Sequence, residues 1–217
     1  MRPNFTFGPI DSVTQYLLYL SIVVLGILLP LAVQRWVKRR QDRQLLEGTR
    51  TALAAEVAAN RARVARSQES FAALAAHLDG DIAAYRALWD AAAQPSGDSA
   101  PPQPPPPIDL TVAYATTIRT AWDTANFRQA LPLMPAASLA RYSRAYQLQR
   151  ALEEHRAIFL AAAMRASALE APSDLSVARN VERRIETLLE LQAFAQHHAG
   201  LSRSLVDAYD ETLADAG

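Results

Sequence analysis

Hydrophobic and polar positions follow two different patterns in the first half of the chain. Residues 13–34 carry no charge, and twelve of the residues between Tyr16 and Val33 are Leu, Ile or Val. From residue 45 to residue 89 the apolar positions instead recur at intervals of three and four, with charges between them, which is typical of an amphipathic helix. We therefore expect the first segment to face apolar surroundings on all sides and the second to bury a single face.

The uncharged segment has the length of a membrane span. As a helix, its 22 residues extend about 33 Å and can cross a hydrocarbon core of about 30 Å. Pro30 lies near one end, where a neighbouring turn can satisfy the freed carbonyl group, so we expect a bend and no break. A cleavable signal peptide is the main alternative, but it would have a shorter apolar run and a small-residue cleavage site soon after it. We predict a retained transmembrane helix over 13–34, preceded by a flank over 1–12.

Basic residues follow the apolar run directly. Five lie within 35–43 beside one acid, whereas the flank 1–12 holds one basic and one acidic residue. Because Lys and Arg concentrate on the cytoplasmic side, we predict a single-pass protein of the bacterial inner membrane, with its N-terminus outside and the remainder cytoplasmic. Aromatic rings and cations prefer the headgroup layer, and anionic headgroups are the predicted lipid partner. The predicted membrane-interface residues are Tyr16, Arg35, Trp36, Lys38, Arg39 and Arg40.

Three regions are expected after the span. Residues 35–93 form a basic juxtamembrane segment and the long amphipathic helix; whether this helix breaks near Gly80 stays open. Residues 94–108 hold seven prolines and predict a polyproline II linker, with a PxxP-type ligand as the less favoured interpretation. Residues 109–217 predict helices over 111–131, over 136–169 after Pro135, and from Ser173 or Asp174 to about 213, with Pro172 closing the turn before the last one.

The expected architecture is all-α. No alternating β pattern, hairpin signal or internal repeat appears in the sequence. Long amphipathic helices joined by short turns bury their stripes as up-down neighbours, so we predict a single N-terminal transmembrane helix followed by an irregular antiparallel helical bundle. Helical hairpins from 109–217 would pack against the first amphipathic helix. Asn60 and Ser67 share the inner face of that helix, which favours a bundle over a two-stranded zipper.

Composition narrows the function classes. No cysteine occurs, which excludes disulfides, thiolate metal sites and cysteine nucleophiles. Nine basic and three acidic residues lie within 35–66, but twelve basic and eighteen acidic residues lie within 67–217. Since phosphate backbones need a concentrated basic face, we predict no nucleic-acid partner.

The histidines do not complete a metal motif. His77, His155, His197 and His198 lack a Glu three residues earlier, and HExxH is absent. His77 and Asp81 are expected to be an exposed pair on a helix, and His197 and His198 to be surface or boundary residues on different faces. No glycine-rich phosphate loop or nucleophile elbow occurs either. We predict no enzyme activity, no catalytic or metal-binding residue and no cofactor.

The sequence also predicts a buried cluster of polar and aromatic residues. Large aromatic residues at helix spacing usually pack in a core, which favours that interpretation over a ligand pocket. A buried amide at Asn60 must be hydrogen-bonded or it costs about 1–3 kcal/mol, and Glu56, one turn earlier, is its expected partner. The cluster comprises Glu56, Asn60, Trp122, Tyr142 and Tyr146.

Some of these residues also occur in motifs that give the chain a resemblance to other proteins. The chain resembles a widespread set of uncharacterised single-pass bacterial inner-membrane proteins with a helical cytoplasmic domain. The resemblance covers most of the chain apart from the Pro-rich linker, and it implies no activity and no site. The features that carry it are the span with its basic cluster, Glu56-x-x-x-Asn60, Thr120-Ala121-Trp122-Asp123 and Tyr142-x-x-x-Tyr146.

The sequence therefore predicts a membrane-anchored helical interaction or scaffold protein. Its partner would be an unknown protein or a second copy of the chain. A membrane-linked sensory or signal-transducing bundle is the alternative, which a hydrated pocket near Trp122 would favour. A metal-dependent bundle enzyme is a third class, and it would need inward-pointing carboxylates and histidines in one cluster.

Overall fold

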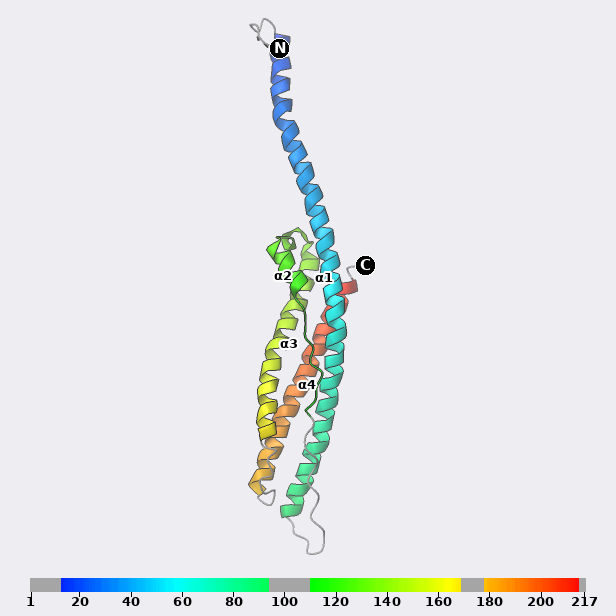
Figure 1. Ribbon diagram of the computed structural model, residues 1–217, viewed down its shortest axis with the longest axis vertical. Helices are drawn as coiled ribbons and strands as arrows, with labels where there is room; N and C mark the ends of the chain where they lie inside the picture. Colours follow the sequence, from blue (N-terminus) through cyan, green and yellow to red (C-terminus); the bar gives the residue numbers. More distant parts are fainter. Residues whose placement is uncertain (1–12, 94–109, 169–177, 215–217) are drawn as a thin grey trace, which may run out of the picture. The chain divides into compact units, whose positions relative to one another are not determined.

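The described part of the chain is helical. The computed structural model describes residues 13–93, 110–168 and 178–214, and within these ranges no strand occurs, which confirms the all-α class. The flank 1–12, the Pro-rich linker 94–108, and the predicted turn at Pro172 with its caps Ser173 and Asp174 lie outside the described residues. The elements are α1 (Val13–Ala93), α2 (Thr120–Phe127), the 3-10 turn η1 (Leu131–Leu133), α3 (Ala136–Ala168) and α4 (Ala178–Ala214) (Figure 1).

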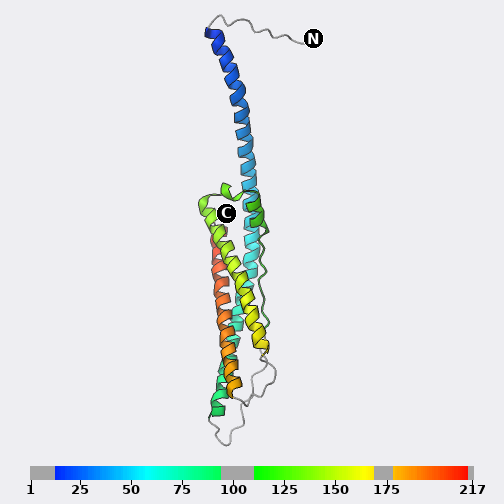
Figure 2. The same cartoon turned by 90° about the vertical axis from the view of Figure 1, so that its left-hand side faces the viewer.

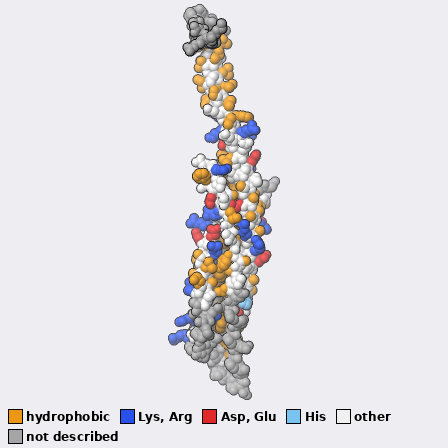
Figure 3. All heavy atoms as spheres, in the orientation of Figure 1, with side chains coloured by type: hydrophobic (Ala, Val, Ile, Leu, Met, Phe, Trp, Pro, Cys, Tyr) orange, Lys and Arg blue, Asp and Glu red, His pale blue; other side chains and the backbone are white. Residues whose placement is uncertain are grey.

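The chain divides into two compact units, 1–48 and 49–217, and α1 contributes to both. In the first unit α1 continues through Pro30 without interruption, as predicted. It contains a segment long and apolar enough to cross a membrane, and none of the most apolar stretch is buried. Figure 3 shows apolar side chains covering the visible face of this stretch, with Lys and Arg side chains where it ends.

The second unit is a bundle of α1, α3 and α4. The α3–α4 pair is antiparallel, since Arg144 pairs with Glu211 near one end and Arg165 with Glu190 near the other. The α1–α4 pair is antiparallel as well, because Arg61 pairs with Asp210 and Asp79 accepts a hydrogen bond from Gln192. These two pairs agree with the predicted antiparallel packing.

The α1 and α3 helices, in contrast, run parallel. Glu56 contacts Tyr146, and fifteen residues further along α1 the ring of Phe71 contacts that of Phe159. The prediction that all neighbouring helices alternate up and down is therefore wrong for this pair. The cause is the segment that precedes α2. It runs back along α1, so that α3 begins at the same end of the bundle as residue 49 (Figures 1 and 2).

This return segment, residues 110–119, is not helical, so the predicted helix over 111–131 is wrong for its first half. The backbone lies along α1 in the opposite direction: Ala113 N–H donates to Ser70 Oγ (2.9 Å) and Ile118 N–H to Asn60 Oδ1 (2.9 Å). Several β-branched side chains lower its helix propensity. Ser70 and Asn60 of α1 thus accept hydrogen bonds from backbone N–H groups that would bond within the segment if it were a helix. The β-branched residues are Thr111, Val112, Thr116, Thr117 and Ile118.

The core is aromatic at its centre. The fully buried ring of Phe71 lies 4.9 Å from that of Phe159 and 5.3 Å from that of Tyr114, both edge to face. Burying one such side chain is worth about 1.5–3 kcal/mol. The predicted inner-face position of the polar residues Asn60 and Ser67 on α1 is confirmed, since both are buried. The helix also continues through Gly80 without a break.

Candidate functional site

Asn60 joins α1 to the return segment through a two-point contact. Its Nδ2 donates to the carbonyl of Ile118 (2.7 Å), and its Oδ1 accepts from the Ile118 N–H (2.9 Å). The side chain is fully buried, as predicted, but the expected partner was wrong: Oδ1 also accepts from Arg63 (3.2 Å) and no bond joins it to Glu56 among the described contacts. Asn60 therefore satisfies both backbone hydrogen-bonding groups of Ile118, as a paired strand would do in a sheet.

Glu56 has its own pair of donors. One carboxylate oxygen accepts from the Tyr146 hydroxyl (2.5 Å) and the other from the Ala121 N–H (2.7 Å). The Trp122 ring lies against that of Tyr146, with centroids 4.7 Å apart and a tilt of 31°. The structure therefore brings Glu56, Trp122 and Tyr146 together, one helical turn from Asn60. Tyr142 is also buried, one turn earlier on α3.

The phenols around this cluster are hydrogen-bond donors and stay protonated. Burial raises the pKa of Tyr146, and its bond to Glu56 raises it further. Burial likewise raises the pKa of Tyr209, which donates to Gln149 Oε1 (3.1 Å); Gln149 Nε2 in turn donates to the Ile118 carbonyl (3.4 Å). The arrangement fixes the return segment in place. The burial of Tyr142 and Tyr146 supports the core interpretation for these two rings, whereas Trp122 is half-buried.

A second polar group, which the sequence reasoning missed, lies between α3 and α4. His155 Nδ1 and His198 Nδ1 are 3.4 Å apart, and the His198 ring lies 3.8 Å from that of Phe71. His197 is exposed, so the two adjacent histidines do face different ways, but His198 is only 2% exposed and the prediction of a boundary position was wrong. Its place could have been read from the inner-face spacing of Leu191, Ala195 and Leu205.

Burial also explains the protonation of these histidines. It lowers the pKa of His198 to about 4, helped by His155 and His197 nearby. Burial lowers the pKa of His155 as well, again with His197 contributing. Both rings are therefore neutral at pH 7. The predicted exposed pair His77–Asp81 forms at 3.7 Å, although the Asp81 side chain is only 9% exposed.

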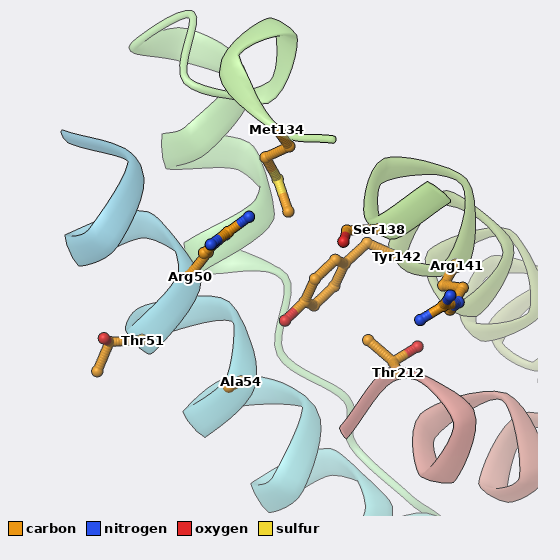
Figure 4. Close-up of a pocket in the computed structure, with 8 residues that line it drawn as sticks. All are labelled: Arg50, Thr51, Ala54, Met134, Ser138, Arg141, Tyr142 and Thr212. Carbon is orange, nitrogen blue, oxygen red and sulfur yellow. The ribbon is translucent and has the colours of Figure 1, made fainter. Parts of the chain in front are cut away.

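Tyr142 lines a cavity of about 170 Å³ at the end of the bundle where residue 49 starts. Figure 4 shows its ring extending from α3 toward α1, with the Arg141 guanidinium beside Thr212 and Arg50 reaching from α1 toward Met134. Two arginines and no carboxylate are among the described residues that line it. The lining residues are Arg50, Thr51, Ala54, Met134, Ser138, Arg141, Tyr142 and Thr212.

The outer face of α3 carries an apolar stripe near the end of the helix. Its members are spaced by three and four residues, and Met164 among them is 73% exposed. The helix is therefore apolar on two sides, one toward Phe71 and the core and one toward solvent. The stripe, hereafter the α3 stripe, consists of Ala157, Ile158, Leu160, Ala161 and Met164.

The predicted membrane-interface residues all lie on α1 in the first unit. Tyr16 and Trp36 are exposed at 55% and 62%, and the Arg40 guanidinium lies 5.8 Å from the centre of the Trp36 ring. Arg35, Lys38 and Arg39 are exposed on the same stretch. Their exposure is compatible with a headgroup contact.

Comparisons with known proteins give no assignment. No family model, no curated protein and no solved structure matches the chain. Over the ranges that the structure describes, no group of three or more His, Asp or Glu side chains is placed to hold a metal ion. The resemblance to single-pass bacterial inner-membrane proteins stays a prediction.

Proposed function

We propose that the protein is a non-enzymatic scaffold of the bacterial inner membrane that associates with further copies of itself through the α3 stripe. A single span over 13–34 holds it in the bilayer, with the N-terminus outside and the bundle in the cytoplasm. Arg35, Lys38, Arg39 and Arg40 contact anionic headgroups, each contributing about 1 kcal/mol near the surface.

The observation that carries the proposal is the α3 stripe. Met164 and Ile158 are 73% and 52% exposed although the opposite face of the same helix is already packed in the core. Apolar side chains at this spacing are typical of a surface that meets another helix. The small side chains of Ala157 and Ala161 allow a close approach of two backbones.

A second copy is the occupant that the surroundings favour. Two ion pairs beside the stripe form within the chain, Arg150 with Glu154 (2.9 Å) and Arg165 with Glu190 (2.7 Å), so these four charges do not repel an identical surface. Two copies held in one membrane also share an orientation and a raised effective concentration. A two-fold symmetric contact then places the same stripe on both sides of the interface.

The absence of cysteine makes the test direct. Ala157→Cys, Ala161→Cys and Met164→Cys are expressed singly in the full chain, and isolated membranes are oxidised. At least one variant should give a disulfide-linked dimer on a non-reducing gel, because sulfurs near a two-fold axis come within bonding reach. An Ala76→Cys variant, at an exposed position of α1 outside the stripe, should react with an impermeant maleimide only after the cells are permeabilised.

Ala76→Cys is the matched control. Ala76 is exposed on α1, five residues after Phe71, just as Met164 lies five residues after Phe159 on the parallel helix. This variant should remain monomeric. Dimers from Ala76→Cys in the same yield, or none from the three stripe variants, would refute self-association through α3, and labelling in intact cells would refute the cytoplasmic placement.

A sensory or signal-transducing bundle is the second candidate. The observation in its favour is the cavity lined by Tyr142, which opens between the helices close to the Trp122 cluster and carries two arginines. A ligand there would contact α1, α3 and α4 at once. Such a contact can change helix packing only through a difference in affinity between two arrangements.

A further inference from the structure

We propose that a second cavity, between α1 and α2, binds a short peptide with free termini, with the ammonium group at Glu56 and the carboxylate at Arg128. This inference goes beyond the scaffold function and does not depend on self-association. It rests on the shape of the cavity, on the two charged side chains that line it and on the spacing between them.

One wall of this cavity is a short face of α1. Thr49, Ala52 and Glu56 line it at intervals of three and four residues, so their side chains share one side of the helix. Ala52 is the only residue between the other two on this wall, and its side chain is small and exposed. The cavity has a volume of about 340 Å³, within the range of about 300–1,000 Å³ that is usual for small-molecule sites.

The opposite wall is a face of α2. Ala121, Thr124, Ala125 and Arg128 line the cavity with the spacing of one helix face. The Arg128 N–H donates to the Thr124 carbonyl (2.9 Å), so the helical spacing continues to Arg128. At about 1.5 Å per residue, Arg128 lies about 10 Å along the helix from Ala121. Because the Ala121 N–H is bonded to Glu56, the carboxylate and the arginine mark the two ends of this wall.

The carboxylate of Glu56 can accept further donors. Each of its oxygens accepts one hydrogen bond, from Ala121 N–H and from the Tyr146 hydroxyl, whereas an ionised carboxylate offers about four acceptor sites. Both donors are uncharged, and no Lys or Arg of the described ranges forms an ion pair with Glu56. A ligand ammonium group would supply both the missing donors and the opposite charge.

The guanidinium of Arg128 provides the complementary charge. The residue is exposed, and its side chain has no hydrogen-bond or ion-pair partner within 13–93, 110–168 and 178–214. Arginine binds a carboxylate through two parallel hydrogen bonds. An extended chain spans about 3.3–3.6 Å per residue, so the termini of a tripeptide lie about 10 Å apart, which matches the spacing along α2.

The test is isothermal titration calorimetry of the full chain in phosphatidylcholine nanodiscs, with trialanine as the probe. We expect saturable binding of trialanine. N-acetyl-trialanine lacks the ammonium group and should bind about tenfold more weakly. Trialanine amide lacks the carboxylate and should bind about threefold more weakly, a smaller loss because water screens the exposed Arg128.

Matched variants decide whether this cavity is responsible. Ala52→Leu fills the space between the two walls and should abolish binding, whereas Ala55→Leu, at an exposed position of α1 outside the cavity, should leave it unchanged. Arg128→Gln should weaken trialanine about threefold and leave trialanine amide unaffected, because the amide has no charge for Arg128 to bind. Arg203→Gln, at an exposed position of α4, is its control and should have no effect.

Three results would overturn the inference. The first is the absence of saturable trialanine binding, and the second is equal binding by the wild type and Ala52→Leu. The third is equal affinity for trialanine and its two blocked forms, which would mean that the charged termini are not recognised. Since Ala52 and Arg128 are exposed, their replacement leaves the fold intact, and circular dichroism verifies this for each variant.

Discussion

Asn60 illustrates how one side chain determines the path of a distant segment. Its amide forms a donor and an acceptor bond with the backbone of Ile118, 58 residues further along the chain. The Asn60 side chain is fully buried and its bonds to Ile118 are partly buried, where an unpaired backbone N–H or carbonyl is costly. The return segment therefore depends on this residue more than its single position suggests.

Replacement of Asn60 should destabilise the bundle. Asn60→Ala leaves the N–H and carbonyl of Ile118 without these partners, so the free energy of unfolding should fall by about 2–4 kcal/mol. Urea denaturation of the full chain in mild detergent, followed by circular dichroism, measures it. Asn126→Ala, at an exposed position of α2, is the control and should change the value by less than about 0.5 kcal/mol. Equal losses in the two variants would contradict the role of Asn60.

The sequence could predict that Asn60 is buried but not what it contacts. Asn60 follows Val57 by three residues and precedes Val64 by four, a helical spacing that places it on the inner face of α1. Its partner is a backbone group, and backbone groups leave no trace in the residue types. The partner of Glu56 was hidden for the same reason, since one of its donors is the Ala121 N–H.

At the scale of single elements, the end of α2 shows a strained cap. Gln129 N–H donates to Asn126 O (3.0 Å) and Ala130 N–H to Ala125 O (2.9 Å), which is the Schellman pattern. Gln129 sits in the left-handed region with φ of 55°, a conformation that glycine adopts at far lower cost. The cap stops α2 and turns the chain toward η1 and α3.

Gln129→Gly should therefore stabilise the protein. Relief of the left-handed strain should raise the free energy of unfolding by about 0.5–1 kcal/mol, as measured by urea denaturation. Gln129→Ala, which keeps the Cβ atom and hence the strain, is the matched control and should give no gain. A gain of the same size from both replacements would mean that the glutamine side chain, and not the backbone conformation, is responsible.

Among the helices, periodicity and proline predicted α1, α3 and α4 well. Pro135 precedes Ala136, the first residue of α3, where its fixed φ suits the start of a helix. Residues 111–119 were predicted as part of a helix because Val112, Ala115 and Ile118 also fit a three-residue spacing. Their extended form depends on Ser70 and Asn60 of another helix, which local periodicity does not reveal.

At the scale of the whole molecule, the buried histidines make stability depend on pH. The pKa of His198 is lowered to about 4 in the folded protein, whereas an unfolded histidine has its usual pKa near 6.5. The unfolded chain therefore binds more protons between these values. The contribution of His198 is fully present above about pH 6.5 and is lost as the pH falls toward 4.

Replacement of His198 should flatten this dependence. Protonation of His198 should cost the wild type about 2–3 kcal/mol of unfolding free energy between pH 6.5 and pH 4. His198→Phe keeps an aromatic ring against Phe71, and its loss of unfolding free energy over the same range should be smaller by this amount. Urea denaturation at several pH values measures the difference. Asn126→Ala, at an exposed position of α2, changes no titratable group and should retain the wild-type slope. A parallel profile for His198→Phe would contradict the assignment.

The long sequence separation between α1 and its packing partners affects how the bundle folds during synthesis. Arg61 finds its partner Asp210 149 residues later, so the first helix leaves the ribosome long before the last one exists. Domains generally fold as units during translation, and contacts between distant residues form late. The core face around Phe71 thus stays uncovered while α3 and α4 are synthesised. The bundle can therefore assemble only after α4 has been synthesised. A nascent chain that stalls before α4 would expose the apolar face of α1, to which chaperones would bind.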